Sequence, residues 1–425
     1  MRDLQGLQPD LYRCFMERMW QHTGPRGIIG MIHFETHFTD EGAGALRKEL
    51  YHRLRRHWHF VNELQLFDIQ HQKNYGVTIH GQRRDEPSFK QACWLYHPDT
   101  VTRSLSHDGS GPEPGMKDPE GSWDLRPHGR RITEVSSTTL TAWHEILGEG
   151  AEVPVTRTRM VYTVNQTTAE VLEKLAKTQR IGGLGLQFSP GWHETGDRRK
   201  GYFDSAWGAP ESWDDVILQG PHLFVATPFY KTPNQTMLHH LDWSATDFEA
   251  LPPDAVPVTS YKPTGDRQRY DSGYTMWGEG TNARSARDFY RIAWRCMAAN
   301  TGERTLIPAI IPPGAAHVDG IFAAGLPSGP IHDLPLVQAV LSSLVSDFAT
   351  RTVPKNHIRA PQIARLPWPG SDTPLRNELI LRALRLNCVT AAYADLWREC
   401  YAAAFRDDSW AGGFEHARRS PLGDV

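Results

Sequence analysis

Four arginines between residues 287 and 304 are the side chains whose type and spacing best suit a ligand. Arg287, Arg291 and Arg295 stand four residues apart, and Arg304 follows a short polar stretch. Each guanidinium presents a planar fork of hydrogen-bond donors, which fits phosphate oxygens and the guanine edge. The group therefore indicates a contact with nucleic acid.

A plainer interpretation stays open for the same residues. Asp288 and Glu303 lie in the same segment, so the arginines could be surface residues that pair with neighbouring carboxylates. Spacing alone does not separate the two interpretations.

The pattern around these arginines predicts a helix, a turn and a strand. Arginines four residues apart would share one face of the helix. Asn300 and Gly302 would end it, and residues 305–311 would form a strand in which Pro308 requires a sheet edge or a bulge. The apolar stripe of the helix would comprise Phe289, Ile292, Ala293, Cys296 and Met297.

A second set of basic and polar residues stands on loops beside aromatic residues. Such cations could hold the phosphates of a nucleic-acid backbone, or they could belong to plain surface turns. The set comprises Arg198, Arg199, Lys200, Lys231, Asn234 and Lys262.

Metal and nuclease chemistry have weaker support. His33, Glu35 and His37 alternate along the chain, but no H-E-x-x-H spacing accompanies them. Pro253-Asp254 is not followed by the acidic residue and lysine of a nuclease motif. The cysteines, which number five, are scattered and read as reduced thiols. We predict no metal site and no DNA cleavage.

Composition limits the possible partners. The chain has 425 residues, 39% of them hydrophobic, which suits two or three globular domains. Its 46 basic and 49 acidic residues give a net charge of −3, so any nucleic-acid surface must be a local basic patch. No apolar run approaches the about 18 residues of a membrane span and no signal region is apparent. We expect a cytoplasmic protein without membrane contacts.

The order of predicted elements divides the chain into four parts. A helix at 11–20 and strands at 27–32, 60–67, 75–80 and 92–96 give residues 1–100 an α/β pattern, with a pair formed by the last two strands. Residues 101–150 read as a loop-rich insertion, residues 151–370 as a mixed domain, and residues 371–425 as a helical region.

The segment YRIAWRCMAANTGERTLIPAIIPPG (290–314) resembles the target-recognition region of large adenine-specific DNA methyltransferases. These enzymes belong to the BREX and DISARM phage-defence systems and to fused restriction–modification proteins. The resemblance rests on an arginine-bearing segment, an asparagine, and the sequence R-T-L-I followed by proline. Weaker likeness extends to ILQGPHLFVATPFYKTPN (217–234), PVTSYKP (257–263) and RLNCVTAAYADLW (385–397).

The resemblance implies a fold class and a partial function. Residues 1–100 would be an α/β remnant, the distal half of a Rossmann-like methyltransferase sheet, followed by a mixed α+β target-recognition domain (151–370) and C-terminal helices (371–425). The family's F-x-G-x-G element for S-adenosylmethionine and its Asn-Pro-Pro-aromatic element are missing, because the Pro-Pro pairs follow Leu251 and Ile311. We therefore assign no catalytic or cofactor-binding residue.

The chain would then be the DNA-recognition and partial catalytic portion of an N6-adenine methyltransferase, cut at both ends. It would bind double-stranded DNA and be inactive alone, needing its missing half or a partner chain that carries the cofactor and Asn-Pro-Pro-aromatic motifs. The alternatives are a non-catalytic specificity subunit that docks on other defence proteins and a truncated product without function.

Overall fold

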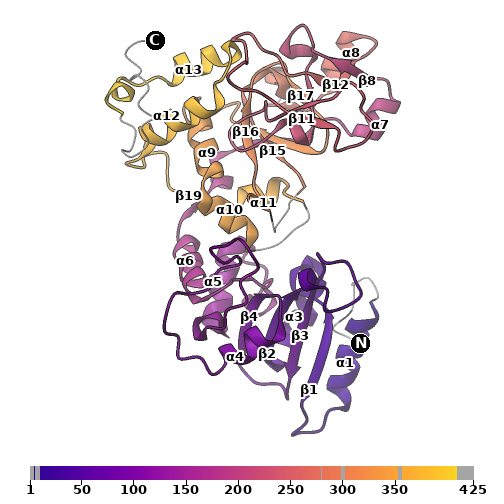
Figure 1. Cartoon of the computed structure of the whole chain (residues 1–425), viewed down its shortest axis with the longest axis vertical. Helices are drawn as coiled ribbons and strands as arrows, with labels where there is room; N and C mark the ends of the chain where they lie inside the picture. Colours follow the sequence, from indigo (N-terminus) through magenta and orange to yellow (C-terminus); the bar gives the residue numbers. More distant parts are fainter. Residues whose placement is uncertain (1–3, 5–9, 279, 298–301, 353–356, 409–425) are drawn as a thin grey trace. The chain divides into compact units, whose positions relative to one another are not determined.

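The computed structural model describes residue 4 and residues 10–278, 280–297, 302–352 and 357–408 (Figure 1). The chain divides into two compact units, residues 1–178 (unit 1) and residues 179–425 (unit 2). In the part of the chain that the structure describes, no helix is long and apolar enough to cross a membrane.

Unit 1 is built on one five-stranded sheet. In spatial order its strands are β1 (Ile29–Phe34), β3 (Asn74–His80), β2 (Leu54–Val61), β4 (Ser88–Leu95) and β5 (Thr133–Ser136). β3 is antiparallel to both β1 and β2, β2 is parallel to β4, and β5 is antiparallel to β4. β1 and β2 are thus parallel to each other, with β3 between them.

The helices of unit 1 flank this sheet. The connection from β1 to β2 contains α3, whose Leu46, Leu50 and Tyr51 are fully buried. The helices are α1 (Leu11–His22), α2 (Thr36–Thr39), α3 (Gly44–Arg53), α4 (Pro98–Ser104), α5 (Ser137–Leu147) and α6 (Gln166–Ala176).

The two faces of the unit 1 sheet carry different side chains. On one face, an apolar cluster that includes Trp58, Phe60 and Tyr75 packs against Val101 of α4. The opposite face carries histidines, because side chains alternate across a strand. His33, His57, His59 and His80 all lie there and are buried.

Unit 2 is organised around a four-stranded antiparallel sheet. In spatial order its strands are β16 (Pro308–Ile311), β15 (Arg291–Arg295), β18 (Ile321–Gly325) and β7 (Gln187–Ser189). Ile292 and Trp294 face a core shared with the helices α9 (Asp333–Ser342) and α12 (Arg376–Asn387). Ala293 lies on the other face of the sheet, in a cluster with Ala309 and Ile311.

Smaller pairs of strands and short helices surround this sheet. The antiparallel pairs are β8 (Phe203–Gly208) with β12 (Thr259–Pro263), β10 (Lys231–Pro233) with β11 (Trp243–Ala245), β13 (Met276–Trp277) with β14 (Arg284–Ser285), and β19 (Pro367–Trp368) with β6 (Gln179–Arg180). β17 (Ala316–His317) pairs in parallel with β9 (Ile217–Leu218). The remaining helices are α7 (Glu194–Arg199), α8 (Arg267–Gly273), α10 (Leu344–Arg351), α11 (Ala360–Ala364) and α13 (Ala394–Cys400).

The helix predicted over residues 289–297 is wrong. The chain forms a short 3-10 turn (η10, Ala286–Asp288) and then the strand β15. Positions four residues apart share a face in a strand as they do in a helix, so the arginine spacing could not discriminate. The following strand is present as β16 at the sheet edge, as Pro308 requires. Asn300, the predicted helix stop, lies outside the described residues.

Other sequence predictions meet mixed outcomes. The predicted helix at 11–20 and strand at 75–80 are confirmed as α1 and β3. The strand predicted at 60–67 is wrong beyond Val61, where a 3-10 turn follows. β3 and β4 do not pair, because β2 lies between them. Within the predicted loop-rich insertion, residues 105–128, all of which the structure describes, contain no helix or strand, while β5 and α5 follow within unit 1.

Candidate nucleic-acid interface

Two of the predicted DNA-binding arginines lie inside unit 2. Arg287 is buried, donates from Nε to the carbonyl oxygen of Gly314 at 2.7 Å and pairs with Asp271 at 2.5 Å. Arg291 is fully buried and donates to the carbonyl oxygen of Ala315. Burial also lowers the pKa of Arg291. Both guanidinium groups hold the segment after β16 in place, Arg287 from η10 and Arg291 from β15, and both are used in internal hydrogen bonds.

Arg304 is also part of the interior framework. Its Nε lies 3.5 Å from the carboxylate of Asp347, which Arg351 approaches to 2.8 Å from the other side. The same carboxylate accepts hydrogen bonds from the backbone N–H groups of Thr305 and Leu306, each at 2.8 Å. We therefore do not retain Arg287, Arg291 or Arg304 in a DNA surface.

Arg295 and Lys231 differ from the three interior arginines, because both lie beside an aromatic ring and neither has a carboxylate partner among the described residues. Lys231 Nζ lies 5.4 Å from the ring centroid of Tyr230, and the Arg295 guanidinium lies 5.8 Å from it. Phe224 stacks on the same ring at 4.7 Å. Arg295 donates to the carbonyl oxygen of Leu223 at 2.5 Å, and among the described residues neither cation forms an ion pair. We call Tyr230, Lys231 and Arg295 the cation–tyrosine cluster.

The sheet formed by β8 and β12 adjoins this cluster. Trp207 on β8 is 39% exposed and donates from Nε1 to the carbonyl oxygen of Pro233 on β10 at 2.8 Å. Lys262 on β12 extends over Gly208, where its Nζ lies 3.4 Å from the position of an added Cβ. Within the described ranges, Lys262 also has no ion pair. An exposed indole ring and a third unpaired cation thus lie on the strands next to Lys231.

The loop between β10 and β11 is held in one shape by a carboxylate. Asp242 accepts from the side chains of Asn234 at 2.8 Å and Thr236 at 2.6 Å, and from the backbone N–H of Leu238 at 2.9 Å. These hydrogen bonds, that of Thr236 first, lower the pKa of Asp242 to about 2. Leu238 and Leu241 at the tip are 78% and 72% exposed. The amide of Asn234, predicted to contact DNA, is instead used within the loop.

The basic triplet at the end of α7 is partly committed to neighbours. Lys200 pairs with Asp197 at 2.9 Å, and Arg198 donates to Ser205 at 3.2 Å. Arg199 is exposed and has no ion pair among the residues described. Only Arg199 of this triplet therefore resembles Lys231 and Lys262 in being unpaired.

A groove elsewhere on unit 2 is a poorer candidate for an anion. It encloses roughly 850 Å³, and its lining includes four aspartates against three arginines. Arg267 pairs there with Asp215, and Arg284 pairs with Asp288 at 3.4 Å. The excess of carboxylates would repel phosphates.

The histidine-rich face of unit 1 gives no metal site. His33 Nε2 lies 3.0 Å from the hydroxyl of Thr78, and His37 Nδ1 lies 3.0 Å from the hydroxyl of Tyr12. The described residues contain no group of three or more ligands placed to hold a metal ion. Sequence reasoning missed that Glu35 lies between His57 and His59, because they are distant in the sequence.

The residues present do not fit S-adenosylmethionine. Gly148 is the left-handed C-cap of α5, and Gly185 ends a 3-10 turn (η6, Ile181–Leu184). Gly278 follows β13, which is only two residues long, and residue 279 lies outside the described residues. A cofactor-binding loop places its G-x-G glycines directly after a long strand. Among the described G-x-G sequences of this chain, none has that position. No step of methyl transfer is therefore assigned to this chain.

Comparison with known proteins gives little. No family model matches the sequence, and no curated protein matches it. Among solved structures, the type IIG restriction endonuclease BpuSI is similar at 11% sequence identity and a TM-score of 0.31. The match covers 90% of this chain and 45% of that chain, so the chain spans less than half of its length. A likeness this distant assigns neither a fold nor a function.

Proposed function

We propose that the chain is the DNA-recognition and partial catalytic-domain portion of an adenine-specific DNA methyltransferase from a phage-defence or restriction–modification system. Unit 2 would bind duplex DNA through the cation–tyrosine cluster, Trp207 and Lys262. The observation that carries the proposal is that these cations lack carboxylate partners among the residues that the structure describes, while most neighbouring cations are paired.

The position of the unpaired cations in the sequence supports this choice. Lys231 lies in the segment 217–234 and Lys262 in the segment 257–263, both of which resemble the recognition region of the methyltransferases. The hydrogen bond from Trp207 to Pro233 links the two segments through β8. Unpaired cations next to aromatic rings suit backbone phosphates and exposed bases.

The sheet of unit 1 supports the methyltransferase part of the proposal. The segment β1–α3–β2 is a crossover between parallel strands, which is the building unit of α/β sheets. Methyl transfer would need S-adenosylmethionine and an Asn-Pro-Pro-aromatic element from the missing half or from another chain. This chain's own residues would supply the DNA contact.

A salt-dependent binding titration tests the DNA contact. Binding of a labelled duplex is followed by fluorescence anisotropy between 50 and 200 mM salt for the native chain and for Lys231→Ala/Lys262→Ala. We expect weaker binding and a log–log salt slope smaller by about one for each lost phosphate contact. Lys200→Ala is the matched control, because Lys200 is exposed but paired with Asp197. Absence of binding, or an equal slope in the double variant, would refute the proposal.

A methyl-transfer assay tests the second part of the proposal, that the chain is only part of a methyltransferase. The chain alone should transfer no methyl group from S-adenosylmethionine to DNA, and robust turnover would contradict the half-enzyme assignment. Co-purification with a chain that carries the Asn-Pro-Pro-aromatic motif would support a split enzyme. DNA binding without such a partner would instead favour a non-catalytic specificity subunit.

A further inference from the structure

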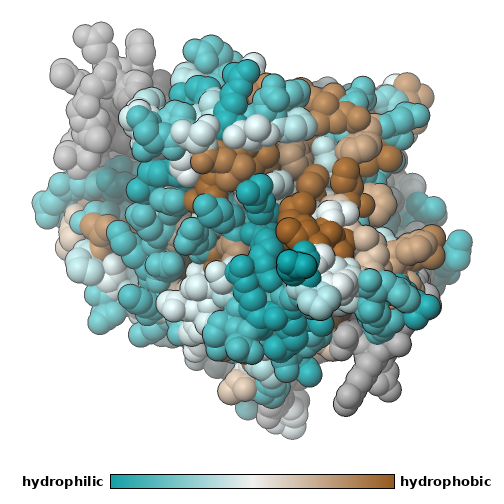
Figure 2. All heavy atoms as spheres, turned by 90° about the horizontal axis from the view of Figure 1, so that it is seen from below, coloured by the Kyte–Doolittle hydropathy of each residue, from teal (hydrophilic) through white to brown (hydrophobic). Residues whose placement is uncertain are grey.

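The loop between β10 and β11 presents two leucines to solvent. Leu238 and Leu241 are 78% and 72% exposed, and every residue from 235 to 241 is exposed. Figure 2 shows hydrophobic residues at several places on the face that it draws, so exposure alone does not mark a binding site. The leucines of this loop are distinguished by the way in which the loop is held.

Hydrogen bonds fix the shape of the loop. Asp242 accepts from the side chains of Asn234 and Thr236 and from the backbone N–H of Leu238. The backbone N–H of Asn234 donates to the carbonyl oxygen of Asp242 at 3.1 Å, and that of Met237 donates to Asn234 at 3.1 Å. Met237 has a φ of +43°, a left-handed conformation that a residue with a Cβ adopts only where neighbouring contacts impose it. Leu238 therefore cannot fold back onto unit 2 without breaking this network.

The strands beneath the loop are anchored to the body of unit 2. Trp207 donates to the carbonyl oxygen of Pro233, the residue directly before the loop, at 2.8 Å. Trp243 lies opposite Pro233 on β11, and its ring centroid is 4.8 Å from that of His222. His222 is buried, and its Nε2 lies 2.9 Å from the carbonyl oxygen of Val258. The two leucines thus stand on a support that is fixed to the interior.

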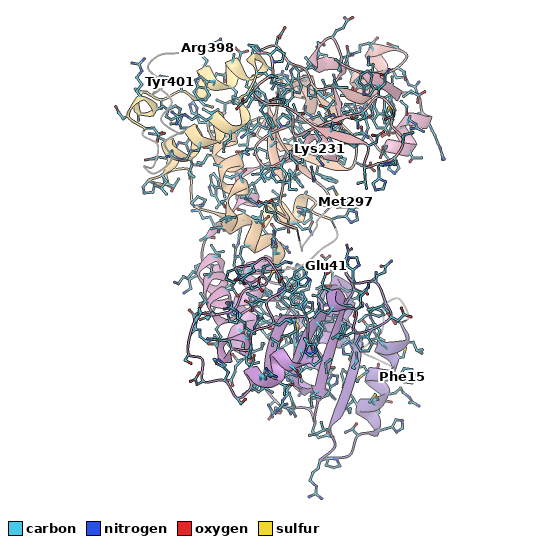
Figure 3. All side chains as sticks on the ribbon, viewed as in Figure 1. Phe15, Glu41, Lys231, Met297, Arg398 and Tyr401 are labelled. Atoms are coloured by element: carbon cyan, nitrogen blue, oxygen red, sulfur yellow. The ribbon has the colours of Figure 1, made fainter. Side chains whose placement is uncertain are left out.

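The loop belongs to a segment without acidic residues. Residues 216–241 contain no aspartate or glutamate, but they contain Lys231, His239 and His240. Asp242 follows directly, and its carboxylate is used in the three hydrogen bonds within the loop. In Figure 3, Lys231 lies away from the helical end of unit 2, where Arg398 and Tyr401 are labelled. Apolar side chains among basic ones match duplex DNA, in which stacked bases lie between rows of phosphates.

We propose that residues 237–241, which we call the leucine tip, enter a groove of duplex DNA and insert Leu238, with Leu241 beside it, between two neighbouring base pairs. This inference rests on the proposed DNA contact of unit 2 and identifies a base step as the ligand of the loop. DNA-bending proteins use leucine, isoleucine, methionine or phenylalanine as such a wedge, which unstacks the bases and kinks the duplex. Because unstacking costs free energy, a loop that is already ordered suits this task better than one that must order on binding.

The spacing between the leucine tip and Lys231 fits the depth of a groove. Lys231 stands three residues before Asn234 on β10, which is about 10 Å along an extended strand. The grooves of B-DNA are about 8 Å deep. With the leucine tip at the floor of a groove, Lys231 would lie near the phosphates at its rim. One hairpin would then supply both the wedge and a phosphate contact.

A duplex with one abasic site tests the wedge. A base step beside an abasic site opens more easily, because less stacking is lost. In fluorescence anisotropy, the native chain should bind a short duplex with a central abasic site about tenfold more tightly than the same duplex with all its bases. Leu238→Ala/Leu241→Ala should bind the two duplexes equally, with the native log–log salt slope, because no phosphate contact is lost.

Bending of the duplex provides a second measurement. A wedge kinks DNA by about 20–90°, so the native chain should raise the energy transfer between dyes at the two ends of the intact duplex. The double leucine variant should not raise it. Its thermal midpoint should equal that of the native chain, because both leucines are exposed.

Two further variants serve as controls. Leu386→Ala removes a leucine that is 60% exposed on α12, and it should keep the native preference for the abasic duplex. Lys231→Ala/Lys262→Ala should weaken the binding of both duplexes and lower the salt slope, but it should keep the preference. The leucines and the lysines would thereby be assigned to bases and phosphates separately.

A pair of substitutions at Asp242 tests the support of the leucine tip. Asp242→Ala keeps both leucines but removes the acceptor of three hydrogen bonds, so it should lose most of the preference for the abasic duplex. Asp242→Asn changes the charge equally but keeps an oxygen that can accept from Thr236 and from the backbone of Leu238. It should therefore retain more of the preference than Asp242→Ala does.

The outcomes separate the wedge from the DNA contact itself. A native chain that binds neither duplex would refute both. A native chain that binds both duplexes equally, with the expected salt dependence, would overturn the wedge alone. So would a double leucine variant that keeps the preference and the bending. The leucine tip would then fit an apolar pocket of a protein rather than a base step.

Discussion

Both units bury arginines, but among the described residues unit 1 buries seven histidines and unit 2 only two, and the two kinds of side chain have different consequences for stability. Imidazole can enter the interior as a neutral group at pH 7, so its burial costs little until it must accept a proton. Guanidinium stays charged and must satisfy its donors wherever it lies. Unit 1 should therefore be more sensitive to acid than unit 2, whereas the buried arginines of either unit should depend on their partners.

Two buried histidines of β2 in unit 1 are arranged around one carboxylate. His57 donates to Glu35, and His59 Nε2 lies 3.5 Å from the other carboxylate oxygen. The backbone N–H of Trp94 donates to His59 Nδ1 at 3.2 Å, which leaves the proton of His59 on Nε2. Burial lowers the pKa of His59 to about 4 and that of His80 to about 3. The pKa of Glu35 is lowered by His57 and His59 against the opposing effect of its burial.

In unit 2 the arginines of η10 and β15 donate hydrogen bonds to backbone carbonyl groups. Arg287 donates to Gly314, Arg291 to Ala315 and Arg295 to Leu223. Arg291 and Arg295 thereby link the central sheet, and Arg287 the turn η10 before it, to a loop that has little regular structure of its own. Buried arginines thus replace the backbone pairing that a regular sheet would supply.

Acid should separate the two units most strongly. The pKa values of His33, His37, His59 and His80 in unit 1 are lowered mainly by burial, as are those of His222 and His317 in unit 2. A lowered folded-state pKa means that the unfolded chain binds more protons, so stability is complete above pH 6.5 and falls towards the folded-state pKa values. The four histidines whose folded-state pKa values are about 3 to 4, namely His59, His80, His222 and His317, should each remove about 2 kcal/mol by pH 5.

The lowered pKa of Glu35 acts in the same direction, because its contribution is present above the unfolded value of about 4.5 and is lost at lower pH. Because unit 1 has four histidines with a lowered pKa and unit 2 has two, hydrogen exchange at pH 7 and pH 5 should show greater loss of protection in the strands of unit 1 than in β15 and β18. Equal loss in the two units would contradict the comparison.

The next largest effect should come from removing the carboxylate between two arginines of unit 2. Asp347→Ala leaves Arg304 and Arg351 without their charge partner and two backbone N–H groups without an acceptor. We expect a loss of about 3–5 kcal/mol in the free energy of unfolding. Urea denaturation measures it.

A matched aspartate provides the control for this change. Asp395 also pairs with an arginine, Arg398, but both side chains are about seven-tenths exposed. Asp395→Ala should alter the free energy of unfolding by about 0–1 kcal/mol. A similar loss in both variants would show that burial does not determine the contribution of these pairs.

The sequence predicts some elements of the fold and not others. α1 and β3 were predictable, because α1 has an amphipathic pattern and β3 lies between clear turn residues. The strand β15 was not, because Ile292, Ala293 and Trp294 are all buried, and a short run buried on both faces has no periodicity that separates helix from strand.

The candidate DNA-binding site was likewise predictable only in part. Lys231 and Lys262 were found from their aromatic neighbours in the sequence. Whether a cation has a carboxylate partner depends on residues that are far away along the chain, such as Asp271 for Arg287 and Asp347 for Arg304. The organising role of Asp242 was missed for a simpler reason, because one carboxylate in a polar loop has no distinctive pattern.

A smaller loss of stability should follow from placing an extra methyl group against the carboxylate of Glu35. A Cβ added at Gly76 would lie 2.5 Å from Glu35 Oε1, and that carboxylate cannot move freely because it lies between His57 and His59. Gly76→Ala should destabilise unit 1 by about 1–3 kcal/mol. Gly183→Ala in unit 2, where nothing lies within 4 Å of the added atom, is the control. Equal midpoints in urea denaturation would show that the carboxylate has room to shift.

The smallest effect on stability should come from the unpaired cations of unit 2. Lys231 contacts only the ring of Tyr230 among the described interactions, so Lys231→Ala should change the free energy of unfolding by no more than about 0.5 kcal/mol. The same substitution should weaken duplex binding, because a phosphate contact is lost. Urea denaturation, which measures stability, and anisotropy titration, which measures DNA binding, would then distinguish the structural arginines of unit 2 from its DNA-binding cations. If Lys231→Ala destabilised the fold as strongly as Asp347→Ala, Lys231 would belong with the structural arginines and not with the DNA surface.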